Sequence, residues 1–123
     1  MRVTREKFEE LVAQAIDGLP KEFAELLENV AVVVEEEPSD DDLREVEIDP
    51  DDPDRDELFG IYQGVPLAER DTFYSQLPDR VAIFRGPILR SCGSRRQILR
   101  EVRDTVVHEL GHHFGLDKDD MPY

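Results

Sequence analysis

The chain has 123 residues, of which 39% are hydrophobic and 37% charged, and it carries a net charge of −15. This length fits a single domain over residues 1–123 with one core. No apolar run approaches the ~20 residues of a membrane-spanning helix, and the acidity disfavours nucleic acid and anionic lipid as partners. The first residues lack the apolar stretch of a signal peptide and Cys92 is the single cysteine, so we expect a cytoplasmic protein without internal disulfides.

Two helices and a strand are expected in the first third of the chain. Apolar residues recur at helical spacing between Thr4, a candidate N-cap, and Gly18, a candidate left-handed helix stop. Pro20 suits the first turn of a short second helix, because an N–H would have no helical partner at that position. The continuous β-branched residues 30–36 then predict a buried strand.

Most of the negative charge lies in one segment. Residues 35–57 contain fourteen acidic side chains, two arginines and three prolines. Dense like charge leaves this stretch little to bury, so we expect a mobile loop at about residues 37–57. Alternating aspartates suggest a calcium-binding loop, but Glu57 stands where such a loop needs glycine and Gln63 where it needs glutamate, which excludes calcium.

The rest of the chain predicts two more strands and a long helix. Residues 58–67 have the composition of a short edge strand. Residues 79–88 alternate their apolar side chains as a strand does, until Gly86-Pro87 ends the pattern. Ser94 is a candidate N-cap for the last helix. The order helix, helix, strand, loop, strand, strand, helix is typical of a small α+β domain.

The last helix carries all three histidines of the chain within residues 108–113. His108, Glu109 and His112 match the pattern H-E-x-x-H in the helical context that it requires. Residues four apart lie about 40° apart around a helix and roughly 6 Å along it, so two imidazoles so placed can bind one metal ion. We therefore expect one Zn²⁺ on His108 and His112, with Glu109 as the general base for a metal-bound water.

A third protein ligand is normally needed, and the residues after the motif offer candidates. Gly115 permits a left-handed helix stop that turns the chain back toward the metal. Asp117, Asp119 and Asp120 then become candidate carboxylate ligands. His113 is one position out of register, so we expect it to pack or to support the site rather than to bind the metal.

Three further residues have a possible role near the motif. Asp104, one turn before His108, could accept the second N–H of that imidazole, although an ordinary solvent-facing helix residue is the favoured interpretation. Tyr62 and Tyr74 are candidates for stabilising the oxyanion of a hydrolytic reaction. The spacing of the residues favours neither tyrosine.

The stretch "TVVHELGHHFGLD" resembles the signature of the minimal zincin-like metallopeptidases, a family of small bacterial proteins. The stretches "REKFEELVAQAIDGLP", "GIYQGVPLAER" and "LPDRVAIFRGPI" are also similar to that family. The resemblance implies a reduced zincin-like fold, with a small, mainly three-stranded sheet, N-terminal helices and a C-terminal active-site helix. An edge strand of that sheet could hold an extended peptide.

The chain departs from the family pattern at one position. The elongated zincin motif that ends in aspartate would place this residue three positions after Gly115, where the chain has Lys118. Asp117 and Asp119 flank that lysine. Asp117 is therefore the first choice for the third ligand and Asp119 the second.

Two classes of function remain in competition. The first is a zinc-dependent metallopeptidase that hydrolyses peptide bonds and has a peptide or protein as its substrate. The second is a catalytically weak or inactive interaction module that keeps the zincin fold. Glu109 favours the enzyme, because a purely structural metal site has no need of a general base. A metal-dependent ribonuclease of the three-histidine type is disfavoured by the histidine spacing and by the acidity of the chain.

Overall fold

The structure, a computed structural model, describes residues 2–64 and 79–115. Its helices and strands, in chain order, are α1 (Arg5–Asp17), α2 (Lys21–Leu26), η1 (Leu27–Asn29), β1 (Val30–Glu35), α3 (Asp40–Glu45), η2 (Pro53–Glu57), β2 (Gly60–Gln63), β3 (Asp79–Phe84), α4 (Arg85–Ser91) and α5 (Arg95–Phe114). Within these described ranges, no helix is long and apolar enough to span a membrane.

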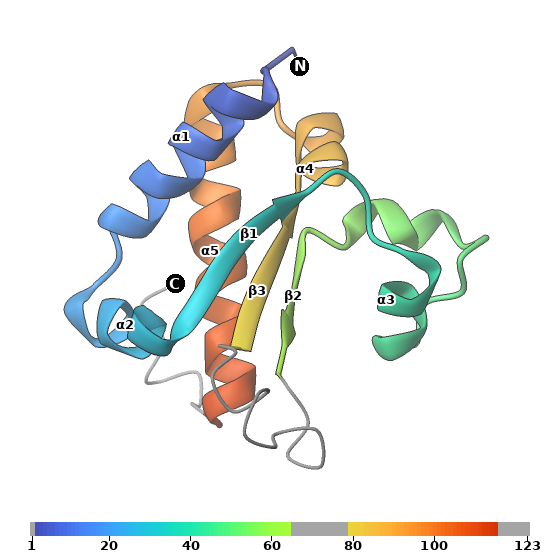
Figure 1. The fold of residues 1–123 in the computed structure, drawn as a ribbon. Helices are drawn as coiled ribbons and strands as arrows, with labels where there is room; N and C mark the ends of the chain where they lie inside the picture. The colour runs from blue at the N-terminus through green and yellow to red at the C-terminus, as the bar shows by residue number, and fades with distance from the viewer. Residues whose placement is uncertain (1, 65–78, 116–123) are drawn as a thin grey trace.

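The described strands form one mixed sheet in the order β1-β3-β2. β1 runs parallel to the central strand β3 and places Val32 opposite Val81, whereas β2 runs antiparallel and places Tyr62 opposite Val81. Figure 1 shows α5 crossing behind the sheet, with α1 packed along α5. The fold is therefore α+β, and β2 is an edge strand, as its sequence predicts.

The main core lies between the sheet, α1 and α5. Val81 and Ile83 of β3 point to this side, while Ala82 and Phe84 point to the opposite face with Ile61. The two helices contribute buried side chains at helical spacing, which are Phe8, Leu11, Val12 and Ala15 from α1, and Ile98, Val102, Val106, Val107 and Leu110 from α5. The apolar stripe that the sequence predicts for α1 thus faces this core.

Local residues set both ends of α5. The Ser94 side chain accepts a hydrogen bond from a backbone N–H of the first turn (3.2 Å), so Ser94 is the predicted N-cap. Gly115 has a φ of 68° and is the predicted left-handed stop. The same expectation for Gly18 is wrong, since its φ is −88°. A further turn, closed by the Leu19 N–H on the Ile16 carbonyl (3.0 Å), continues α1 without a left-handed residue.

The acidic segment between β1 and β2 contains α3 and η2, so it differs from the continuous loop that its charge predicts (Figure 1). Ser39 and Asp42 form a capping box, in which each side chain accepts the other's backbone N–H at 3.0 Å. Leu43 is fully buried, and Asp42 Oδ1 accepts a hydrogen bond from Gln63 Nε2 on β2 (2.7 Å). These contacts fix α3 beside the edge strand.

A short helix, α4, follows β3 where the sequence predicted only the end of a strand. β3 does end before Gly86 and Pro87, but the chain then turns directly into a helix. Proline is compatible with the first turn of a helix, because an N–H has no helical partner there. A Cβ on Gly86 would collide with the carboxylate of Glu37, so the acidic segment packs directly on the start of α4.

Candidate active site

The H-E-x-x-H motif occupies the last two turns of α5. His108 and His112 are exposed, Glu109 between them is half-buried, and Leu110 is fully buried in the core. Helical spacing thus divides the motif, with both imidazoles on the surface and the apolar side chain under the sheet. Two imidazoles on successive turns of one rigid helix are available to a ligand from the same side of the protein.

The Glu109 carboxylate lies against the edge strand. Its Oε2 atom accepts a hydrogen bond from the backbone N–H of Tyr62, and the two atoms are 3.3 Å apart. Burial raises the pKa of the Glu109 carboxyl, an effect that the Tyr62 hydrogen bond and the charges of His112 and His108 oppose in part. A carboxylate with a raised pKa holds an accepted proton better at neutral pH, which suits a general base.

The Tyr62 N–H is available to Glu109 because it takes no part in the sheet ladder. The Phe84 N–H donates to the Phe59 carbonyl (2.8 Å), so the backbone N–H and C=O of Phe84 point toward β2 and those of Ile83 point toward β1. Backbone groups alternate sides along a strand, and the N–H and C=O of Val81 therefore also point toward β1. Tyr62, opposite Val81, forms a pair without ladder bonds, and its N–H points to the open edge of the sheet.

Gly60 allows α5 to approach β2 closely. A Cβ at this position would lie 2.6 Å from Thr105 Cγ2 and 2.8 Å from the Ala82 carbonyl oxygen, both shorter than real Cβ contacts. The helix and the edge strand could not keep this spacing around a larger residue. Sequence reasoning placed Gly60 within an edge strand at residues 58–67 but missed this function, although a glycine within a strand pattern is a known signal of close backbone approach.

An aromatic cluster joins the end of α5 to β2. The rings of His113 and Tyr62 stack, with centroids 3.8 Å apart, and Phe114 meets both rings edge-on. The Tyr62 hydroxyl donates to Asp79 Oδ2 (2.7 Å), and His113 Nε2 lies 4.0 Å from the same oxygen. His113 thus packs, as its position in the motif predicts. The proton of the Tyr62 hydroxyl is directed to Asp79, which does not support the oxyanion role considered for Tyr62.

The other residues predicted for the site differ in what the structure describes. Asp104 lies 3.9 Å from Arg103 Nε, and none of its described contacts is with His108. The candidate third ligands, Asp117, Asp119 and Asp120, lie outside the described residues, and so does the second candidate tyrosine, Tyr74.

The described donors fit a zinc ion in their chemistry. Imidazole nitrogen is a favoured zinc ligand, and His108 and His112 stand one turn apart with Glu109 between them. The part of the chain that the structure describes contains no group of three or more His, Cys, Asp or Glu side chains that could hold a metal ion. Of the three residues expected to bind the metal, His108 and His112 lie within the described part of the chain.

Comparison with known proteins gives the family. The chain belongs to the zincin-like metallopeptidases, because the model of that family matches residues 27–123. Among solved structures it is similar to a conserved hypothetical protein from T. thermophilus, with 28% sequence identity and a TM-score of 0.56 over 91% of this chain and 94% of that chain. No curated protein matches the chain. The family and the reduced zincin-like fold implied by the sequence are thus confirmed.

Proposed function

We propose that this protein is a zinc-dependent peptidase. His108, His112 and Asp117 hold one Zn²⁺, and Glu109 is the general base. A bound zinc ion would lower the pKa of a coordinated water toward ~7 and polarise a substrate carbonyl. The observation that carries the proposal is the half-buried Glu109 carboxylate, which lies against an edge strand and is flanked in the sequence by two exposed histidines.

Glu109 supplies the proton transfer. Its carboxylate takes a proton from the attacking water and holds it until the leaving amine accepts it. Burial favours this exchange, because it raises the pKa of the carboxyl above its ordinary value and so makes the carboxylate a stronger proton acceptor. Gln at this position could still hydrogen-bond but could not carry the proton.

The outer edge of β2 orients the substrate. Gly60 and Tyr62 have backbone groups that point away from β3, since both stand in pairs without ladder bonds. An extended peptide can add to such an edge through main-chain hydrogen bonds. The Tyr62 N–H now donates to Glu109, so a substrate carbonyl would compete for the same donor. We propose that the substrate is a peptide or protein segment in extended form.

The test combines metal content with hydrolysis. Purified protein is incubated with zinc, dialysed and measured by elemental analysis, beside His108→Ala, His112→Ala and Asp117→Ala variants. We expect near-stoichiometric zinc in the wild type and its loss in the variants. Glu109→Gln serves as the matched control, because it should keep zinc yet lose cleavage of a peptide library followed by mass spectrometry.

The outcomes separate the enzyme from the alternative, an inactive interaction module with the zincin fold. Wild-type protein that stays metal-free after incubation with zinc would contradict the peptidase. Cleavage that persists in Glu109→Gln would remove the proposed base. Stoichiometric zinc without any cleavage across the library favours the interaction module.

A further inference from the structure

The second edge of the sheet, formed by β1, also has open backbone groups. Ile83 faces β1, so the β1 residue opposite Ile83, which is Val34, has its own N–H and C=O directed outward. The alternation along the strand then directs the backbone groups of Val32 and Val30 outward as well. No described residue outside the sheet donates to or accepts from the backbone of Val32.

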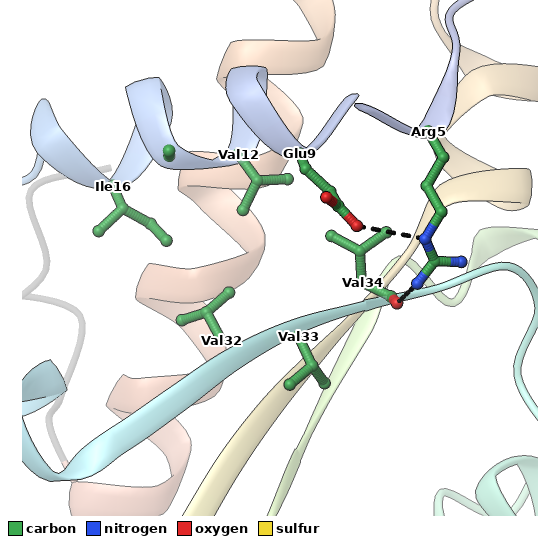
Figure 2. A pocket seen from close by; sticks show the side chains of 8 residues that line it. Arg5, Glu9, Val12, Ile16, Val32, Val33 and Val34 are labelled. Atoms are coloured by element: carbon green, nitrogen blue, oxygen red, sulfur yellow. Dashed lines mark hydrogen bonds and ion pairs between the residues drawn. The ribbon is translucent and has the colours of Figure 1, made fainter. Parts of the chain in front are cut away.

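An apolar groove runs along this open edge. The groove has a volume of about 470 Å³ and lies between α1 and β1. Figure 2 shows Val12 and Ile16 of α1 pointing down toward the side chains of Val32 and Val34. Ala13, which is exposed, completes the helix side of the groove. The volume is in the ~300–1,000 Å³ range of sites that bind small ligands or side chains.

One end of the groove is closed by an ion-paired arginine. Figure 2 shows the Arg5 guanidinium donating to the Val34 carbonyl and paired with Glu9 (3.2 Å). Arg5 also pairs with Glu36 (2.9 Å). The outward carbonyl of Val34 is thus satisfied within the chain. The Val30 N–H is also satisfied, since it donates to the Leu27 carbonyl. The outward N–H and C=O of Val32 remain at the open part of the edge, beside the apolar side chains.

We propose that this groove binds an extended peptide of a partner protein, which adds a fourth strand beside β1. The outward backbone of Val32 requires a partner with its own N–H and C=O in register, as an extended chain has. The valine and isoleucine lining requires apolar side chains at alternate positions of that chain. Neither feature involves the metal-binding motif, so the inference does not rest on the proposed peptidase activity.

Charge specifies the flanks of the peptide and argues against a second copy. The chain has a net charge of −15, so two copies repel each other, whereas a segment with lysine or arginine on either side is attracted. The expected partner segment therefore alternates β-branched residues between basic ends. Because salt screens these charges, the affinity of the groove for such a segment should fall at high salt.

The direct test is amide hydrogen exchange of the full chain, with the exchange rates measured by NMR. The probe is a short acetylated and amidated peptide with alternating valine and threonine between terminal lysines. In the free protein we expect the Val32 N–H to exchange rapidly and the Val33 N–H, which faces β3, to exchange slowly. Added probe should slow exchange at Val32 by about tenfold or more and leave Val33 unchanged. The same probe with proline in place of its central valine should have no effect.

A matched pair of variants tests the place of binding. Ala13→Trp fills the groove from an exposed helix position, while Gln14→Trp adds the same side chain one residue on, outside the lining. We expect the first variant to abolish protection of Val32 by the probe and the second to keep it. Equal loss in both variants would overturn the assignment to this groove.

Three further results would also overturn the proposal. A Val32 N–H that is already protected in the free monomeric chain means that the edge is covered from within. Probe-induced shifts confined to β2 mean that the peptide binds at the other edge. A dimer in sedimentation that Ala13→Trp dissociates means that the occupant is a second copy of the chain.

Discussion

Glu109 Oε2 accepts a hydrogen bond from the Tyr62 backbone N–H, 3.3 Å away, and this bond links the metal-binding motif of α5 to the edge strand β2. The link depends on how closely the helix and strand approach. Contacts at Gly60 and at the Tyr62 ring hold that approach, so substitutions there are expected to change both stability and the site.

Gly60→Ala should lower the free energy of unfolding by about 1–3 kcal/mol, as overpacked sites do. The added methyl would collide with Thr105 and with the Ala82 carbonyl. Gly64→Ala is the control, because its Cβ would meet Asp79 at an ordinary 3.5 Å. Urea unfolding measures both variants. Equal stability of the two would show that α5 does not press on β2 at Gly60.

Tyr62→Phe should cost about 0.5–1.5 kcal/mol of stability, the typical net value of one hydrogen bond. The variant loses the hydroxyl that donates to Asp79 but keeps the ring that stacks on His113. Any peptidase activity should fall by no more than a few-fold. A loss of kcat by orders of magnitude with unchanged stability would instead restore the oxyanion role for this tyrosine.

Leu43→Ala should destabilise the protein by about 2–5 kcal/mol, the usual range for a buried leucine. Leu43 is fully buried, although it lies in the most acidic part of the chain. Asp41→Ala, two residues earlier and 95% exposed, should change stability by less than about 0.5 kcal/mol. A negligible effect of Leu43→Ala in thermal and urea unfolding would mean that α3 does not pack on the body.

Glu36 should make stability dependent on acidic pH. A hydrogen bond from Arg85 holds the pKa of the Glu36 carboxyl below its ordinary value of 4.5, with a smaller contribution from Arg5. Because the folded pKa is the lower one, this stabilisation is present above pH 4.5 and is lost as the pH falls through the folded pKa.

The matched measurement for this pH effect is urea unfolding of the wild type and Glu36→Gln from neutral to acidic pH. We expect the wild type to be more stable above the ordinary pKa and the difference to shrink below it. Glu36 is half-exposed, so the difference should not exceed about 1 kcal/mol. A difference that grows on acidification would contradict the assigned sign.

Cys92 should be almost unreactive in the folded protein. The residue is 6% exposed, and burial raises the pKa of its thiol, so little thiolate is available at neutral pH. Labelling with a thiol reagent should follow the unfolding of the chain and become rapid in concentrated urea. Rapid labelling of the native protein would show that the last helix separates from α4 under native conditions.

Much of the fold follows from local sequence. The stripe of α5 and its caps at Ser94 and Gly115 depend on residues within a few positions of one another, as do the strand patterns of β1 and β3. The placement of His108 and His112 on one helix follows from the same short spacing. Such features are predictable because the interactions that produce them are local.

Tertiary contacts decided the rest. The order β1-β3-β2, the bond from Tyr62 to Glu109 and the docking of α3 through Gln63 and Asp42 join residues far apart in the chain. Composition predicted a loop for the acidic segment, because the repulsion among its many like charges is a stronger sequence signal than the single Leu43. That leucine stabilises α3 only once the folded body offers a surface that buries its side chain. The sequence by itself determined the motif, its helix and the strands. Only packing decided which strand edge meets Glu109 and which edge stays open. The physical reason is that the direction of a strand's backbone groups depends on its register with the neighbouring strands.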